Sequence, residues 1–225
     1  MTTARVAGIF YLLTFVSIPT LALYSAVLAP GYVLGEGPDT AALVGGVLEI
    51  VVALACIGTA VALYPILRTY SEGIALGFMG ARTLEAATIF AGAASLLAVV
   101  SLRQAGVGDD AVVPAQALVA LHDGLRLGQS LMPAVNAALL ATLLYRARLV
   151  PRILPLVGLL GAPLLLITTL GALFNLWPEI SPITGLGALP IALWELSLGV
   201  WLVVKGVRRA PTSPVQPRPL PQQRG

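Results

Sequence analysis

The stretch AALVGGVLEIVVALACIGTAVALYPIL, residues 41–67, carries one charged side chain, Glu49, among 27 residues. About 20 consecutive apolar residues in a helix span the hydrocarbon core of a bilayer, so this stretch is long enough to cross it. Five further apolar runs lie at about residues 6–29, 74–102, 114–145, 153–174 and 186–204. The sequence therefore predicts an all-α fold, an integral membrane bundle of six transmembrane helices.

The composition agrees with this fold class. Hydrophobic residues make up 58% of the 225-residue chain and charged residues 10%, whereas a soluble domain carries roughly 25% charged residues. The first run is longer than the apolar part of a signal peptide, so we expect a retained span, kinked at Pro19. We expect one transmembrane domain over residues 1–209 and a proline-rich, disordered cytoplasmic tail over residues 210–225.

The positive charges predict the orientation. Ten Lys and Arg residues lie beside the spans on one side, whereas Arg103 alone lies on the other. Lys and Arg favour the cytoplasmic side of a membrane protein, so both termini are predicted to be cytoplasmic. The net charge of +3 has the same explanation, and we expect no nucleic-acid partner. The ten are Arg5, Arg68, Arg146, Arg148, Arg152, Lys205, Arg208, Arg209, Arg218 and Arg224.

Polar residues inside the spans are the candidates for a functional site. A charge near the bilayer centre costs roughly 2.5–3.5 kcal/mol, so such residues should face the bundle interior and pair with one another. On the fourth span His122, Arg126, Gln129, Pro133 and Asn136 follow spacings of 4, 3, 4 and 3, which place them on one helix face. The candidates for a polar pocket are Glu49, Arg82, Glu85, His122, Asp123, Arg126, Gln129, Asn136 and Glu195.

The spacing of these residues predicts some of their partners. Asp123 and Arg126 are i,i+3 neighbours, as are Arg82 and Glu85, although Arg82 is also close enough to its span end to extend to the membrane interface. Similar depth suggests that Glu49, Glu195 and Arg126 form one network.

Four acids against two arginines leave two carboxylates without a cation. Such carboxylates must be protonated, hydrated or shared with His122. The polar face of the fourth span either lines a cavity or proton path, or is a structural seam of hydrogen bonds between helices.

Several classes of site lack their sequence signature. Cys56 and His122 are the only cysteine and histidine, too few for a zinc site or a bis-histidine haem, and we expect no metal and no cofactor. The chain contains no GxSxG, HExxH, P-loop or GxGxxG motif that would indicate a known catalytic or nucleotide site.

Short motifs along nearly the whole chain resemble a bacterial family of unknown function, DUF family 4386. That resemblance implies a six-span protein of the bacterial plasma (inner) membrane and supplies no substrate. The motifs are Arg5-Val6-Ala7-Gly8 with Tyr11-Leu12-Leu13, Arg82-Thr83-Leu84-Glu85-Ala86, His122-Asp123 with Gly128, Tyr145-Arg146-Ala147-Arg148 with Pro151-Arg152, and Leu193-Trp194-Glu195-Leu196 with Gly199, Trp201-Leu202 and Lys205-Gly206.

Three hypotheses for function follow from these residues. The first is a non-enzymatic membrane protein that binds or translocates a small solute, a lipid or a proton through a polar intramembrane pocket. The second is a metal-independent lipid enzyme with His122, Asp123 or Glu195 as acid–base groups. The third is a structural or accessory membrane protein, in which the polar residues only hold the helices together. Membrane lipid is an expected partner in all three.

Overall fold

The computed structural model describes residues 2–35 and 38–208. Every regular element in these residues is a helix, and six helical segments are long and apolar enough to cross a membrane. The predicted fold class is confirmed. The expected tail over residues 210–225 and three of the ten basic residues lie outside the described residues, and the orientation stays a prediction. The six segments are Thr3–Leu23, Thr40–Leu67, Glu72–Gln104, Gly108–Ala147, Ile153–Leu173 and Pro182–Val204.

The first segment is broken where the sequence predicts a kink. Helix α1, Thr3–Leu13, is followed by a 3₁₀ turn over Thr14–Ser17 and by the short helix α2, Thr20–Leu23. Pro19 lies at the N-cap of α2 with φ of −65°. Because proline has no N–H to donate to the preceding turn, Pro19 favours a break in the helix at this position.

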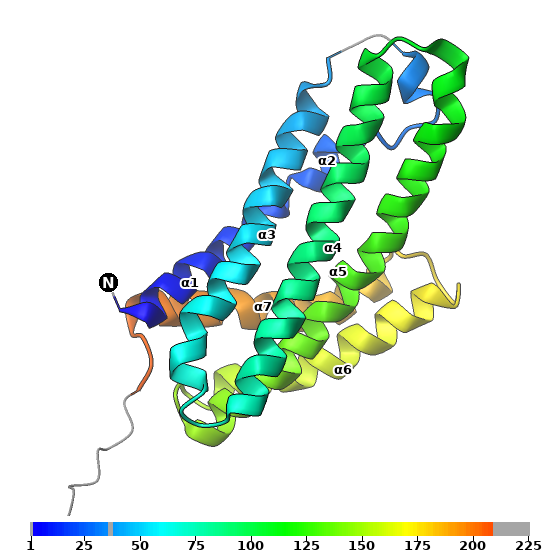
Figure 1. The fold of residues 1–225 in the computed structure, drawn as a ribbon. Helices are drawn as coiled ribbons and strands as arrows, with labels where there is room; N and C mark the ends of the chain where they lie inside the picture. Colours follow the sequence, from blue (N-terminus) through cyan, green and yellow to red (C-terminus); the bar gives the residue numbers. More distant parts are fainter. Residues whose placement is uncertain (1, 36–37, 209–225) are drawn as a thin grey trace, which may run out of the picture.

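Three long helices lie side by side (Figure 1), namely α3 (Thr40–Leu67), α4 (Glu72–Gln104) and α5 (Val112–Ala147). Helix α5 begins at Val112, so Pro114 lies in its first turn, where the N–H that proline lacks would have no partner within the helix. It stays one helix through Pro133.

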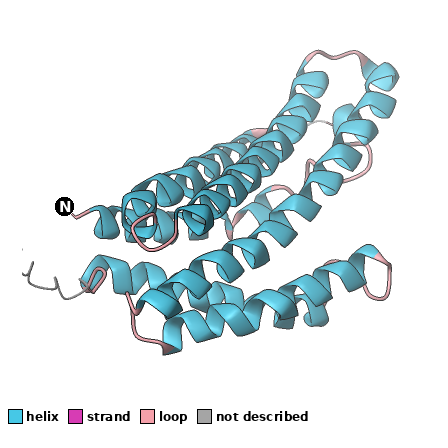
Figure 2. Cartoon of the chain, turned by 60° about the horizontal axis from the view of Figure 1, so that its bottom comes forward, coloured by secondary structure: helices cyan, strands magenta, loops and turns pink. Residues whose placement is uncertain are grey.

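Helices α6 (Ile153–Leu173) and α7 (Pro182–Val204) run at an angle to the three long helices (Figure 2). Helix α7 starts four residues before the expected residue 186 because the Ser181 side chain caps it. The Ser181 hydroxyl accepts from the Thr184 backbone N–H, the Thr184 hydroxyl accepts from the Ser181 N–H, and Pro182 takes the first helical position.

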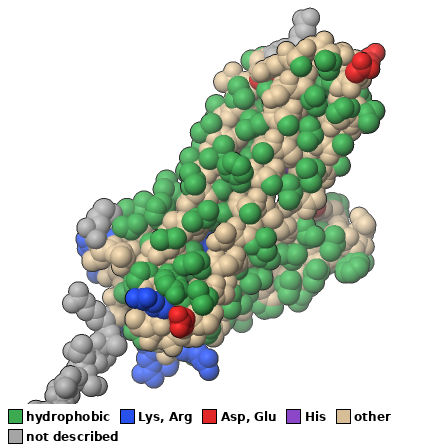
Figure 3. Space-filling view, viewed as in Figure 1, with side chains coloured by type: hydrophobic (Ala, Val, Ile, Leu, Met, Phe, Trp, Pro, Cys, Tyr) green, Lys and Arg blue, Asp and Glu red, His purple; other side chains and the backbone are tan. Residues whose placement is uncertain are grey.

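The two ends of the described chain lie at the same end of the bundle (Figure 1). The Arg208 backbone N–H donates to the Leu149 carbonyl at 2.8 Å, which brings the end of α7 beside the α5–α6 turn. Figure 3 shows Lys and Arg side chains gathered at this end, with hydrophobic side chains along the flanks of the helices. A chain that crosses a membrane an even number of times has both termini on the same side, and the positions of the two ends agree with this.

Arg103, the one basic residue expected on the opposite side, holds the chain before α3. Its guanidinium forms an ion pair with Asp39 at 2.9 Å and donates to the Gly35 carbonyl at 3.1 Å. Asp39 also accepts hydrogen bonds from the Tyr32 hydroxyl and the Gln104 amide, and the Tyr32 bond is the main reason that the pKa of Asp39 lies below its usual value. These contacts fasten Tyr32, Gly35 and Asp39 onto the end of α4.

Small residues let the helices approach closely. A Cβ on Gly8 would lie 2.7 Å from the Gly199 carbonyl oxygen, so α1 and α7 meet backbone to backbone. Gly158 on α6 accommodates the Trp194 ring of α7 in the same way, and Trp194 is 1% exposed. Close helix contact through small residues is typical of membrane bundles, where burial of apolar area between helices gives little free energy.

Candidate binding cavity in the helix bundle

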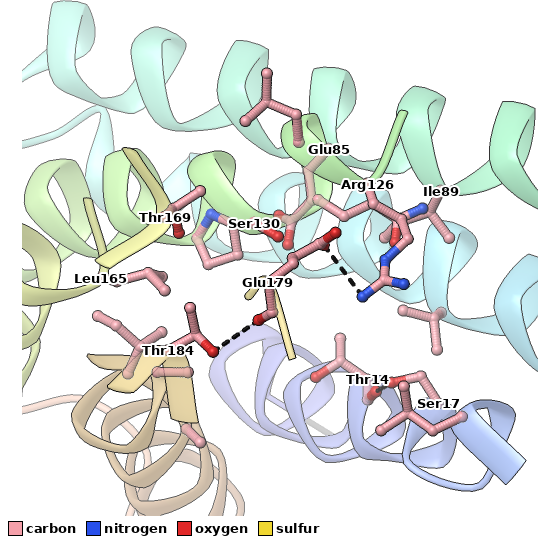
Figure 4. A pocket seen from close by; sticks show the side chains of 18 of the residues that line it. Thr14, Ser17, Glu85, Ile89, Arg126, Ser130, Leu165, Thr169, Glu179 and Thr184 are labelled. Atoms are coloured by element: carbon pink, nitrogen blue, oxygen red, sulfur yellow. Dashed lines mark hydrogen bonds and ion pairs between the residues drawn. The ribbon is translucent and has the colours of Figure 1, made fainter. Parts of the chain in front are cut away.

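A cavity of about 780 Å³ lies inside the bundle, where α6 and α7 diverge from the long helices. Its walls come from the kinked first segment, α3, α4, α5, α6 and α7. It extends from the α6–α7 connection to a buried ionic cluster on α4 and α7, and Figure 4 shows part of its lining. Seven of the nine candidates line it, namely Glu49, Arg82, Glu85, Asp123, Arg126, Gln129 and Glu195.

Arg82 forms the centre of the ionic cluster at the inner end of the cavity. Its NH1 lies 2.7 Å from Glu85 Oε2, the predicted i,i+3 pair, and its NH2 lies 3.4 Å from Glu195 Oε1. The Asn136 amide of α5 also donates to Glu85 Oε2, at 2.6 Å. The cluster therefore ties α4 to both α5 and α7.

The alternative in which Arg82 extends to the membrane interface is wrong, because its side chain is 1% exposed. The Tyr11 ring of α1 lies over the guanidinium at 4.9 Å from ring centroid to Cζ, and the Cys56 thiol of α3 is 3.7 Å from NH1. A cation–π contact and two carboxylates are sufficient to keep this charge inside the bundle. Arg82 Nε and NH2 are nevertheless buried without a hydrogen bond in the part of the chain that the structure describes.

The mouth of the cavity is bridged by a second ion pair. Arg126 NH2 of α5 lies 3.1 Å from Glu179 Oε1 in the α6–α7 connection, and these side chains are 24% and 49% exposed. The Thr184 hydroxyl donates to the Glu179 carbonyl at 2.7 Å and so holds the acid at the start of α7 (Figure 4). The expected partner of Arg126, Asp123, is instead exposed and lines the cavity. Arg126 therefore pairs with Glu179 of the α6–α7 connection and not with Asp123 of its own helix.

Glu49 belongs to a third group of contacts on the α3 side. The Tyr24 hydroxyl donates to Glu49 Oε2 at 3.1 Å, and the Tyr24 ring meets the His122 ring edge-on at 5.9 Å between centroids. His122 Nδ1 lies 3.2 Å from the Gly92 carbonyl oxygen, and His122 is 3% exposed. Glu49, Glu195 and Arg126, expected in one network, thus have different direct partners in the described residues, although the Arg126 charge also acts on Glu49.

Two of the predicted pocket residues lie behind the cavity wall. His122 packs between Tyr24 and the α4 backbone, and the hydrogen-bond partner of its Nδ1 is the Gly92 carbonyl rather than an acid. Asn136 is 2% exposed and supports Glu85. Gln129 lines the cavity, and its Nε2 is buried without a hydrogen bond in residues 2–35 and 38–208. The predicted polar face of α5 is therefore partly cavity lining and partly helix–helix seam.

Three functional contacts were not predicted from the sequence. Tyr11 and Tyr24 look like ordinary aromatic residues of an apolar run, and Glu179 looks like a solvated loop acid. The sequence offers one relevant signal, the Ser181–Thr184 cap directly after Glu179, which keeps that acid close to the start of a helix. Periodicity along one helix does not specify partners on another helix.

No group of three or more His, Cys, Asp or Glu side chains among the described residues could hold a metal ion. The site therefore consists of acids, arginines, amides and hydroxyls on an otherwise apolar wall. Such groups can bind an ionic or hydrogen-bonding part of a ligand while the walls hold an apolar part.

The comparisons with known proteins give one match. Neither the curated proteins nor the solved structures contain a match to the chain. The family described as "Domain of unknown function (DUF4386)" matches residues 6–206, which include all the cavity-lining residues. The chain, a multi-pass membrane protein with six apolar helices, therefore belongs to the DUF4386 family.

Proposed function

We propose that this protein binds a small amphipathic solute or lipid in its intramembrane cavity and translocates it across the bacterial plasma membrane. The observation that carries the proposal is the cavity, which joins a mouth at the α6–α7 connection to a buried ionic cluster in the bundle interior. Ligand cavities of small molecules commonly measure about 300–1,000 Å³, and about 780 Å³ falls in that range. The ten-to-one charge bias supports cytoplasmic termini.

The lining favours an amphipathic ligand. Apolar side chains such as Ile18, Leu165, Leu173 and Ile191 form walls between the mouth and the inner end. The charged groups lie in the Arg82 cluster, at the Arg126–Glu179 pair with Asp123, and at Glu49, so a ligand in the cavity meets both apolar walls and charged groups. A solute with one polar group and one apolar part fits this lining.

The other two hypotheses have less support. Of the three acid–base candidates of the lipid enzyme, Asp123 and Glu195 line the cavity, whereas His122, the one with a ring nitrogen, is held behind the wall by Tyr24 and the Gly92 carbonyl. A purely structural seam would place its polar residues in closed pairs, whereas Asp123 lines the cavity in an exposed position.

The test is to fill the cavity without unfolding the bundle. Ala188 lines the cavity from α7, whereas its neighbour Leu189 is 51% exposed on the outside of the same helix. Ala188→Phe should abolish binding of octyl amphiphiles to protein in lipid nanodiscs and their uptake into proteoliposomes. Leu189→Phe, the matched control, should retain both activities. The proposal fails if wild-type protein binds no octyl probe, or if Ala188→Phe binds as well as wild type.

A further inference from the structure

We infer that the solute bound in this cavity carries a protonated amine, and that its ammonium group sits beside Glu195 at the inner end. This inference rests on the proposed function and specifies the chemical class of its ligand. The argument uses the charge balance of the lining, the unequal contacts of the two buried carboxylates, and the kind of hydrogen-bonding groups that are left without partners.

The lining of the cavity carries an excess of negative charge. It contains five carboxylates and two guanidinium groups, in a chain whose net charge is +3. Asp123 is exposed to solvent, and Glu179 is partly exposed and paired with Arg126. The three largely buried acids, Glu49, Glu85 and Glu195, have one buried guanidinium, Arg82, which leaves two formal negative charges there. An uncompensated charge in an apolar interior is unfavourable, so a cationic ligand is preferred there over a neutral or anionic one. The five carboxylates are Glu49, Glu85, Asp123, Glu179 and Glu195.

The contacts of Arg82 show where a cation would bind. Glu85 receives two short bonds, from Arg82 at 2.7 Å and from Asn136 at 2.6 Å. Glu195 shares the same guanidinium at the longer distance of 3.4 Å, and its side chain is 16% exposed. Glu195 is therefore the carboxylate with the weaker internal pairing, and it faces the cavity. An ammonium group has three donors and no acceptor, and can bond directly to such an oxygen.

The buried hydrogen-bond donors without partners near the cavity do not require an anionic ligand. Arg82 Nε and NH2 are part of a guanidinium that has an acid on two sides, and Gln129 Nε2 belongs to a neutral amide. A neutral acceptor on the ligand, such as a hydroxyl or carbonyl oxygen, would satisfy any of these donors. A second negative charge would instead increase the excess around Glu195.

A proton on one of the carboxylates is the competing way to balance the charge. It would neutralise the inner end without any preference for a cationic ligand. The two explanations differ in one measurable property, which is the affinity for an amine compared with an alcohol of the same chain length.

The experiment uses octylamine, octanol and octanoate as probes of the full chain in lipid nanodiscs, with partitioning into empty nanodiscs subtracted. Wild-type protein should bind octylamine at least about tenfold more tightly than octanol, because a hydrogen bond to a charged group adds that much affinity. Glu195→Gln should reduce the difference to within about threefold. Glu72→Gln, which removes an exposed acid in the first turn of α4 outside the cavity lining, should leave it unchanged.

The possible failures are distinguishable. Equal binding of octylamine and octanol by wild-type protein, or tightest binding of octanoate, would overturn the amine inference and leave the proposed function intact. An undiminished amine preference in Glu195→Gln would also overturn it. If no probe binds, or if Ala188→Phe binds all three as wild type does, the proposed function itself fails. The comparison of the three probes on wild-type protein needs no variant to fold.

Discussion

Replacing Arg82 with glutamine should destabilise this protein far more than replacing either acid beside it. Arg82 is 1% exposed and lies between Glu85 and Glu195 at 2.7 and 3.4 Å. Its loss leaves two carboxylates facing one another without a cation. Loss of Glu195 leaves a neutral pair of Arg82 and Glu85, and loss of Glu85 leaves a longer neutral pair and takes the charged acceptor from Asn136.

The magnitudes follow from these contacts. Removing one partner of a buried ion pair costs about 3–5 kcal/mol, which we expect for Arg82→Gln. Glu85→Gln keeps an amide oxygen for Asn136 but loses the charge at 2.7 Å, so about 1–3 kcal/mol is expected. Glu195→Gln removes the excess negative charge and the longer contact, and the free energy of unfolding should change by less than about 1 kcal/mol.

The assay is equilibrium unfolding of the purified protein in mixed micelles, followed by the fluorescence of its three tryptophans. Arg146→Gln is the matched control, because Arg146 is exposed near the end of α5 and its loss should change stability by no more than about 0.5 kcal/mol. If Glu195→Gln destabilises the protein as much as Arg82→Gln does, the charge argument is refuted. The same result would remove the reason for placing a ligand cation at Glu195.

Three further results are expected. Glu179→Gln should speed release of octylamine from nanodisc-bound protein up to about fivefold, because the partly exposed ion pair of Glu179 with Arg126 contributes at most about 1 kcal/mol. The double variant that exchanges the two charges, Arg126→Glu with Glu179→Arg, should restore the slow release. Gly8→Ala should lower stability by about 1–3 kcal/mol, because its Cβ would lie 2.7 Å from a backbone carbonyl of α7, whereas Gly80→Ala, with nothing within 4 Å, should not lower it. The pKa of Asp39 is lowered in the folded protein, so the stability contributed by its contacts with Tyr32, Arg103 and Gln104 is complete above the usual carboxyl pKa of about 3.9 and is lost as the pH falls through the lower folded value. The protection of the Tyr32 and Gly35 amides, corrected for the pH dependence of intrinsic exchange, should therefore fall between pH 5 and pH 2 in wild type, beyond the fall seen in Asp39→Asn.

The sequence was sufficient to predict the elements but not the partners of the candidate site. Hydropathy identified six spans because each helix must satisfy its own backbone in lipid, and this requirement is local. The i,i+3 pair of Arg82 and Glu85 was also predictable, since it lies within one helix. The expected pairing of Asp123 with Arg126 failed because Glu179, 53 residues away in the chain, faces Arg126 across the cavity mouth.

The depth of a residue along its span was a weaker guide than its direction. His122 and Arg126 lie on the same face of α5, but His122 packs against Tyr24 and Gly92 while Arg126 reaches the mouth of the cavity. Equal depth also suggested a link from Arg126 to Glu49; the Arg126 charge does act on Glu49, but the hydrogen bond to Glu49 comes from the Tyr24 hydroxyl. Which side chain of a polar face is covered depends on the neighbouring helices.

The sequence by itself determined that this protein is an all-α bundle of six apolar helices with more acids than arginines inside the spans. These properties follow from composition and from the backbone's need for internal hydrogen bonds in a bilayer. Only the tertiary structure decided that α6 and α7 diverge from the long helices, and that Glu195 and Glu85 share one guanidinium. The physical reason is that a cavity and a shared charge depend on the crossing of helices far apart in the chain, and no pattern within one helix specifies that crossing.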